Sequence, residues 1–138
     1  MTIKEFIGSH DRFAANSGVK AVSVALDYGK TTLLVTKEHL NAGGVCQGGA
    51  IFTLADTALA LAANSHKLLT FSIEASIYYH KAALEGDTLT AEARAVCAHA
   101  KLPSYEVSVK NNNGDLIASF RSICYNKRIP IEGVDGLE

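Results

Sequence analysis

The chain has 138 residues, of which 48% are hydrophobic, and its 13 Lys+Arg and 14 Asp+Glu give a net charge of -1. This length predicts a single domain over residues 1–138, with enough chain to close one core but not two. A balanced charge with 20% charged residues excludes a disordered acidic tail and a basic arm that binds nucleic acid.

Membrane, secretion and metal signals are weak. The apolar stretch Ile51–Ala63 is interrupted by Thr53, Asp56 and Thr57, and it falls short of the roughly 20 apolar residues that span a bilayer. The N-terminal residues have no apolar run of signal-peptide length. The three cysteines are odd in number and widely spaced, and the five histidines lack zinc-ligand spacing. We therefore expect a cytoplasmic protein without a membrane segment or a metal.

The first third of the chain predicts one helix and two strands. Thr2–Ala15 has helical spacing, with a buried stripe expected at Ile3, Phe6, Ile7 and Phe13. Val19–Leu26 and Thr31–Thr36 are β-branched runs, and the intervening residues 27–30 indicate a hairpin turn.

The centre of the chain predicts a glycine-rich loop followed by a buried helix. Leu40–Gly49 forms the loop, and Ala50–Asn64 is apolar at 11 of its 15 positions without Gly or Pro. A helix that is apolar on nearly all sides is normally wrapped by other structure.

The remainder predicts four strands, at Thr70–His80, Thr88–Ala98, Tyr105–Val109 and Leu116–Tyr125. The second of these is rich in alanine, so a helix competes there on propensity, but apolar and polar residues alternate along it. Residues 111–115, Asn-Asn-Asn-Gly-Asp, are typical of a hairpin turn. The order indicates an α+β class in which a long antiparallel sheet curls around one central helix, the hotdog fold.

Asp56 is the only Asp, Glu, Lys or Arg between His39 and His66. An ionised carboxylate in a buried helix costs several kcal/mol unless it has a partner. It could cap a helix that begins only at Thr57, or make a structural hydrogen bond across a subunit interface. Unpaired acids in apolar clefts are also enriched at active sites, which makes Asp56 a candidate catalytic residue.

The turn at residues 43–49 leads directly into the helix that carries Asp56. Free N–H groups at a helix start can bind an anion or a developing oxyanion, although glycines can also serve the turn alone. Gly48 and Asp56 are eight residues apart, about 12 Å along a helix, which is too far for one reacting group. If the two cooperate, they must come from different subunits of a dimer.

These residues resemble the hotdog-fold thioesterases of the PaaI, or phenylacetate-degradation, type over most of the chain. The resemblance rests on His39-Leu40-Asn41, Cys46–Ala58, Ala63-Asn64-Ser65 and Glu85–Ala91. It implies hydrolysis of acyl- or aryl-acyl-CoA thioesters without a metal, prosthetic group or other cofactor. It also implies homodimers, often paired into homotetramers, with active sites at the dimer interface.

The resemblance assigns roles to four site residues and marks a departure at a fifth, Gln47. Asp56 matches the catalytic carboxylate, which acts as nucleophile or as base towards water, and Gly48 matches the glycine whose N–H polarises the thioester carbonyl. Asn41 matches a residue that orients water or substrate, and Ser72 aligns with an assisting polar residue. Gln47 departs from the usual His-Gly-Gly pattern, because glutamine can hydrogen-bond but cannot titrate near neutral pH.

Weaker candidates have plainer interpretations. Cys46 and His39 could be nucleophile and base, but a small buried cysteine is favoured, and Cys97 and Cys124 lie in strand patterns that indicate packing. Tyr78 and Tyr79 could line the acyl pocket, although aromatic residues of a sheet more often pack in the core. Lys127 and Arg128 are predicted to follow the last strand, where they could bind the phosphates of CoA or form a solvated charged end.

Two alternative functions use the same fold. Gln47 favours a non-catalytic acyl-CoA binding or sensing module, which would bind thioesters without turnover. A hydratase or dehydratase would need a His–acid pair, and His39 is the only histidine near the site in the sequence.

Overall fold

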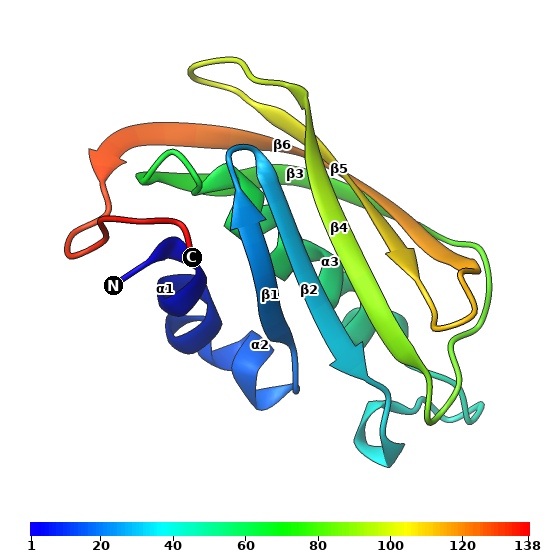
Figure 1. Cartoon of the computed structure of the whole chain (residues 1–138). Coiled ribbons are helices and arrows are strands. Elements are labelled where there is room, and N and C mark those ends of the chain that lie inside the picture. Colours follow the sequence, from blue (N-terminus) through cyan, green and yellow to red (C-terminus); the bar gives the residue numbers. More distant parts are fainter.

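The computed structural model describes residues 1–138, and in it one curled antiparallel sheet wraps a central helix (Figure 1). The sheet has six strands in the order β1-β2-β4-β5-β6-β3. The strands are β1 Lys20–Ala25, β2 Tyr28–Leu34, β3 Leu68–Tyr79, β4 Thr88–Cys97, β5 Ser104–Lys110 and β6 Leu116–Pro130. The helices are α1 Ile3–His10, α2 Arg12–Asn16 and α3 Gly48–Ala63, with a 3-10 turn η1 at Lys37–His39. The predicted α+β hotdog architecture is confirmed.

Helix α3 forms the centre of the core, as its apolar sequence predicts. Nine of its side chains are buried, and the hydroxyl of buried Thr31 on β2 donates to the Leu54 carbonyl at 2.9 Å. One stripe stays only half-buried, at four-residue spacing: Gly48, Phe52, Asp56 and Ala60. Residues four apart share a helix face, so the face that carries Asp56 is incompletely covered along the helix, as are Gly49, Ala50 and Thr53 in its first turns.

Gly29 on β2 lies against α3 so closely that no side chain fits. A Cβ there would sit 2.6 Å from the Leu61 Cβ and 2.9 Å from the Ala62 nitrogen. We expect Gly29→Ala to destabilise the fold by about 1–3 kcal/mol through overpacking, measured by urea unfolding. Gly8→Ala in α1 is the matched control, because its Cβ would meet only Ala21 at 3.5 Å, and a helical Gly-to-Ala change gains up to about 1 kcal/mol. Equal midpoints for the two variants would contradict this packing.

The predicted helix Thr2–Ala15 is wrong in one respect, because it is broken into α1 and α2. The Thr2 hydroxyl and the Glu5 carboxylate form a capping box at the start of α1. Asp11 ends α1 and caps α2 by accepting from the Ala14 N–H at 3.1 Å, so the acid starts a second helix. The new direction leaves Phe13 72% exposed instead of buried, whereas Ile3 and Ile7 are buried as expected.

Three further details differ from the sequence prediction. The first hairpin turns at residues 26 and 27, since β2 already begins at Tyr28. Strand β6 continues to Pro130, so Lys127 and Arg128 lie within the strand and not after it. Cys97 is exposed at the end of β4, whereas Cys46 and Cys124 are buried. None of the helices has the length and apolar character that crossing a membrane requires.

Strand β3 is an edge strand of 12 residues with large apolar side chains exposed along it. Tyr78 is 71% and Ile73 60% exposed, and Phe71 and Tyr79 are also exposed. The expectation that the tyrosines serve the core is therefore wrong. An exposed apolar edge strand presents free backbone groups for pairing with another chain.

Candidate active site

Asp56 lies at the wall of a cavity of about 330 Å³ between α1, α3 and the start of β3. Apolar side chains form most of this wall, including Ile7, Leu59 and Leu69. No group of the chain donates a hydrogen bond to the Asp56 carboxylate. The structure has no fully buried side-chain oxygen without a partner, so both carboxylate oxygens of Asp56 remain accessible to solvent. The half-buried acid is therefore free to act on a molecule in that space.

Burial in the apolar wall raises the pKa of Asp56, and the negative charge of Asp11 raises it further. Asp11 lines the same cavity. Both causes disfavour the charged carboxylate, so Asp56 holds a proton more tightly than an exposed aspartate. Such a carboxyl is a stronger base once it is ionised.

Ser72 lies across the cavity from α3, on strand β3. Its hydroxyl contacts the Ser122 hydroxyl at 2.6 Å and donates to the Glu74 carbonyl at 3.3 Å. These contacts fix the side chain at the cavity wall that it shares with Asp56. The structure therefore brings together two of the five residues predicted for the site.

Gln47 is the N-cap of α3, and its side-chain oxygen accepts from the Gly49 N–H at 2.6 Å. It thereby satisfies one of the free donors at the helix start, in the way that shorter polar caps do. The glutamine keeps the turn closed without titrating. The departure at position 47 therefore leaves the turn intact.

The Gly48 N–H is the first of helix α3, and no carbonyl or side chain of the chain accepts from it. Tyr79 packs over this residue, and its hydroxyl donates to the Gly48 carbonyl at 2.9 Å. A Cβ on residue 48 would sit 2.9 Å from the Tyr79 ring, so only glycine fits without displacing the ring. The free N–H and the positive end of the helix dipole suit a developing negative charge.

Asn41 shapes the loop before the turn. Its side-chain oxygen accepts from the Gly43 N–H at 2.9 Å and from the Val45 N–H at 3.3 Å. The amide nitrogen of the side chain has no partner within the chain and remains available as a donor. Asn41 thus closes the loop with one end of its amide and leaves the other end for a ligand.

His39 and Cys46 do not form a catalytic pair. His39 accepts from the Thr36 N–H at Nδ1, which puts its proton on Nε2, where it donates to the Ser17 carbonyl at 2.6 Å. Burial raises the pKa of the Cys46 thiol, and this disfavours the reactive thiolate. Both residues hold the fold together.

The five predicted residues form two groups. Asp56 and Ser72 share the cavity of about 330 Å³, whereas Asn41, Gln47 and Gly48 surround the start of α3 and do not line it. One member of each group, Gly48 and Asp56, lies on α3, and these two are about 12 Å apart along the helix axis. Within a single chain they cannot act on the same atom.

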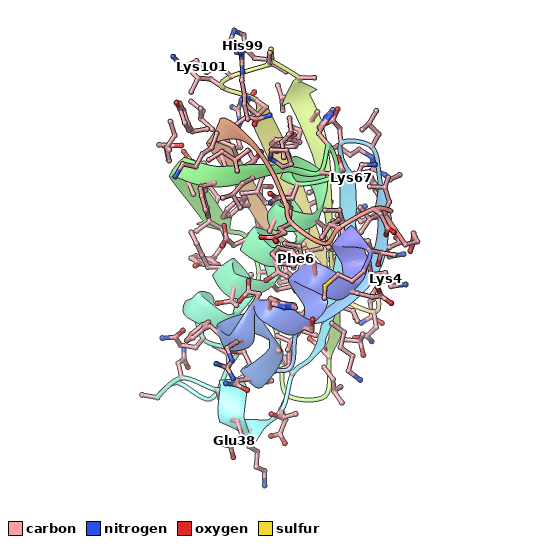
Figure 2. The ribbon with its side chains drawn as sticks, turned by 90° about the vertical axis from the view of Figure 1, so that its left-hand side faces the viewer. Lys4, Phe6, Glu38, Lys67, His99 and Lys101 are labelled. Carbon is pink, nitrogen blue, oxygen red and sulfur yellow. The ribbon has the colours of Figure 1, made fainter.

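Sequence reasoning missed the contribution of the N-terminal segment to this cavity. Phe6, His10 and Asp11 line it opposite Asp56, and Phe6 stacks on His10 with ring centroids 4.9 Å apart. In Figure 2, Phe6 lies on α1 in front of the central helix. No motif marks these residues, because what places them is the break between α1 and α2.

Comparisons with known proteins place the chain in a family. The model of the thioesterase superfamily matches residues 43–118. The acyl-coenzyme A thioesterase PaaI of Escherichia coli is 32% identical over 112 residues, which are 81% of this chain and 80% of PaaI. A protein of Archaeoglobus fulgidus that is provisionally named an esterase is 42% identical over 123 residues, 89% of this chain and 80% of that protein.

Comparison with solved structures indicates the same family as the sequence comparisons. The structure of E. coli PaaI superposes with a TM-score of 0.83 at 28% identity, over 92% of this chain and 96% of PaaI. A Streptococcus mutans protein solved with bound acetyl CoA has a TM-score of 0.77 at 27% identity, over 81% of this chain and 90% of that one. With half of the chain matched by the family and the fold shared throughout, the protein belongs to the thioesterase superfamily, as a hotdog thioesterase of the PaaI type.

Proposed function

We propose that this thioesterase hydrolyses acyl- or aryl-acyl-CoA thioesters to the free acid and CoA. The observation that carries the proposal is Asp56, an acid without a hydrogen-bond partner at the wall of an apolar cavity. The name of the E. coli relative and the acetyl CoA bound to the S. mutans relative support CoA as the thiol.

In the proposed reaction the thioester carbonyl lies between Asp56 and a Gly48 N–H. Asp56 takes a proton from water, and the resulting hydroxide adds to the carbonyl carbon. The Gly48 N–H stabilises the oxyanion of the tetrahedral intermediate. The C–S bond then breaks, and the thiolate, whose parent thiol has a pKa of about 8.5, leaves with little help from an acid. The proton on Asp56 then passes to the thiolate or to water, which restores the carboxylate. No group beyond side chains, backbone and water takes part.

The remaining predicted residues support this arrangement. Asn41 offers its free amide nitrogen to the water or the carbonyl, and Gln47 holds the turn so that the Gly48 N–H points outward. Ser72 forms the far wall beside Asp56. Single-turnover hydrolysis in H₂¹⁸O tests the role of Asp56: ¹⁸O found in the protein would show that its carboxylate attacked the thioester and that water then added to the Asp56 carboxyl carbon of the anhydride, which would contradict base catalysis.

The site requires a homodimer, because Gly48 and Asp56 of one chain are too far apart. We propose that the face of α3 carrying Phe52 and Asp56 packs beside a second copy, which contributes its own Gly48 turn. The exposed edge strand β3 supports this assembly, since pairing of two such edges satisfies their backbone groups and covers Phe71 and Tyr78. The cavity beside Asp56, which residues 69–72 of β3 line, then lies at the interface.

A thiol-release assay with phenylacetyl-, hydroxybenzoyl- and graded fatty acyl-CoAs tests the function. Expected is turnover of at least one thioester class by the wild-type protein. Saturable binding of every thioester without release of CoA would contradict the proposal and establish a binding module.

Replacing Gly48 with proline tests the oxyanion donor. Proline removes the N–H, but it is well tolerated at the first position of a helix. Gln47 already has the ψ of 137° that a residue before proline favours. Gly48→Ala is the matched control, because it adds a Cβ against Tyr79 and keeps the N–H. We expect Gly48→Pro to lower kcat by about 10²–10³-fold relative to Gly48→Ala. Equal kcat values would exclude this N–H from the mechanism.

A further inference from the structure

A second cavity lies beyond the carboxyl end of α3 and has no part in the proposed hydrolysis. Its volume is about 440 Å³, larger than the cavity beside Asp56 and within the roughly 300–1,000 Å³ typical of small-molecule sites. Its walls come from the β1–β2 turn, the β4–β5 hairpin and the end of β6. Figure 2 shows His99 of this hairpin at one end of the molecule and Glu38, just before the Gln47 turn, near the other.

Three hydrogen-bond donors at this cavity have no acceptor within the chain. The Nδ1 atom of His99 accepts from the Lys101 and Leu102 N–H groups, so its proton lies on Nε2. The Asn126 oxygen accepts from the Arg128 N–H at 2.8 Å, which leaves its amide nitrogen free. The Arg128 guanidinium makes no hydrogen bond or ion pair. All three residues line the cavity.

The opposite wall is a fixed acidic network. The hydroxyl of Tyr105, which is 1% exposed, donates to Asp27 Oδ1 at 2.9 Å, and His66 Nε2 contacts the same oxygen at 2.8 Å. The Asp27 N–H donates to the Ser65 hydroxyl at 2.8 Å, which holds the backbone in place. The second carboxylate oxygen, Oδ2, has no partner within the chain.

The remaining wall is apolar. It consists of small or compact side chains, among them Ala63, Leu68 and Pro103. Ala63 also lines the cavity beside Asp56, so the two cavities adjoin at one residue. A ligand that lies on the donor side, away from Asp27, therefore combines an apolar body with an anionic head that accepts from several donors.

We propose that this cavity binds a small organic carboxylate, of the kind that a thioesterase releases as its product acid. The Arg128 fork and the Asn126 amide hold the carboxylate, His99 donates to it, and the apolar wall takes the acyl body. Asp27 disfavours a dianion such as phosphate more strongly than a singly charged carboxylate, because like-charge repulsion scales with the charge. The choice of product acid rests on the proposed function, but the binding chemistry does not.

Titration of the full-length protein with phenylacetate, followed by ¹H–¹⁵N correlation spectra, tests the site. The titration is done on the Asp56→Asn variant as well as on the wild type, so that the result depends neither on hydrolysis nor on the Asp56 carboxylate. Expected are saturable shifts at Asp27, His66 and Asn126 in both proteins. Phenylacetamide, which has the same shape without the charge, is expected to cause none.

Two variants and one control locate the binding. Asn126→Asp keeps the oxygen that accepts from the Arg128 N–H but replaces the free donor by a negative charge, and Arg128→Gln removes the guanidinium. Each is expected to weaken binding by about tenfold or more. Lys127→Gln removes the same charge one residue away, where the lysine lies 5.6 Å from the centre of the Phe71 ring, and is expected to bind normally.

Three outcomes would overturn the site: no shifts around the cavity, equal affinity for phenylacetamide, or wild-type binding by both Asn126→Asp and Arg128→Gln. Phosphate binding at the same affinity would overturn the assignment of an apolar carboxylate. If the protein binds phenylacetate in this cavity but hydrolyses no thioester, the proposed function fails and the binding site stands. If it hydrolyses thioesters but does not bind phenylacetate here, the reverse holds.

Discussion

Asp56→Ala is expected to lower kcat for thioester hydrolysis by about 10²–10⁴-fold, the range that a positioned general base contributes. No other carboxylate can take over the role, because Asp11, the other acid at this cavity, is already engaged as the N-cap of α2. The measurement is thiol release at saturating substrate. Asp135→Asn is the control, since that side chain is 90% exposed and does not line the cavity, and full activity is expected.

The same position predicts a gain in stability. The pKa of Asp56 is higher in the folded chain than the about 3.9 of an unfolded one, so ionisation destabilises the fold. The stabilising effect of Asp56→Asn is therefore absent below about pH 3.9, grows as the pH rises from there towards the folded pKa, and is constant above the folded pKa. Urea unfolding at several pH values measures it.

Near-wild-type turnover by Asp56→Ala would overturn the assignment of the catalytic acid. The alternative that Asp56 caps a helix beginning at Thr57 is wrong, because α3 runs from Gly48 to Ala63. Loss of activity together with loss of stability at neutral pH would instead support the other alternative, a structural hydrogen bond across a subunit interface. Only an unpartnered functional acid explains the combination in which Asp56→Ala loses activity and Asp56→Asn gains stability.

The fold was readable from the sequence because its main signals are strong and local. The apolar run from Ala50 to Asn64 predicts a wrapped helix, and the alternation from Leu89 to Ala93 predicts a strand with a buried face, although alanine favours helix there. Both are confirmed. The break at Asp11 was missed because an acid at helical spacing can extend a helix or cap a new one, and only packing decides between them.

The candidate site was readable in part. A lone charge in an apolar stretch identified Asp56, and the glycine turn identified Gly48, but neither signal tells which atoms share a cavity. The walls that α1 and β3 contribute depend on tertiary packing and leave no spacing in the sequence. Gln47 shows the opposite case: its sequence suggests an altered site, whereas its oxygen closes the turn on the Gly49 N–H.

The dimer hypothesis leads to a further large effect, in mixed dimers of two inactive chains. One chain carries Asp56→Asn and the other Gly48→Pro. If each active site takes Asp56 from one chain and Gly48 from the other, the mixed dimer has one site with both defects and one with neither. Co-expression with two different tags and purification through both yields this mixed dimer, with an expected activity of about half that of the wild-type dimer.

The activity of the mixed dimer distinguishes an active site shared between two chains from one formed within a single chain. Each parent dimer has the same defect in both sites, so its activity stays about 10²-fold or more below wild type. If one chain supplied both Asp56 and Gly48, every site of the mixed dimer would carry one defect, and its activity would match the mean of the parents. The separation of about 12 Å along α3 excludes that arrangement for a single carbonyl group, so half-wild-type activity is the expected result.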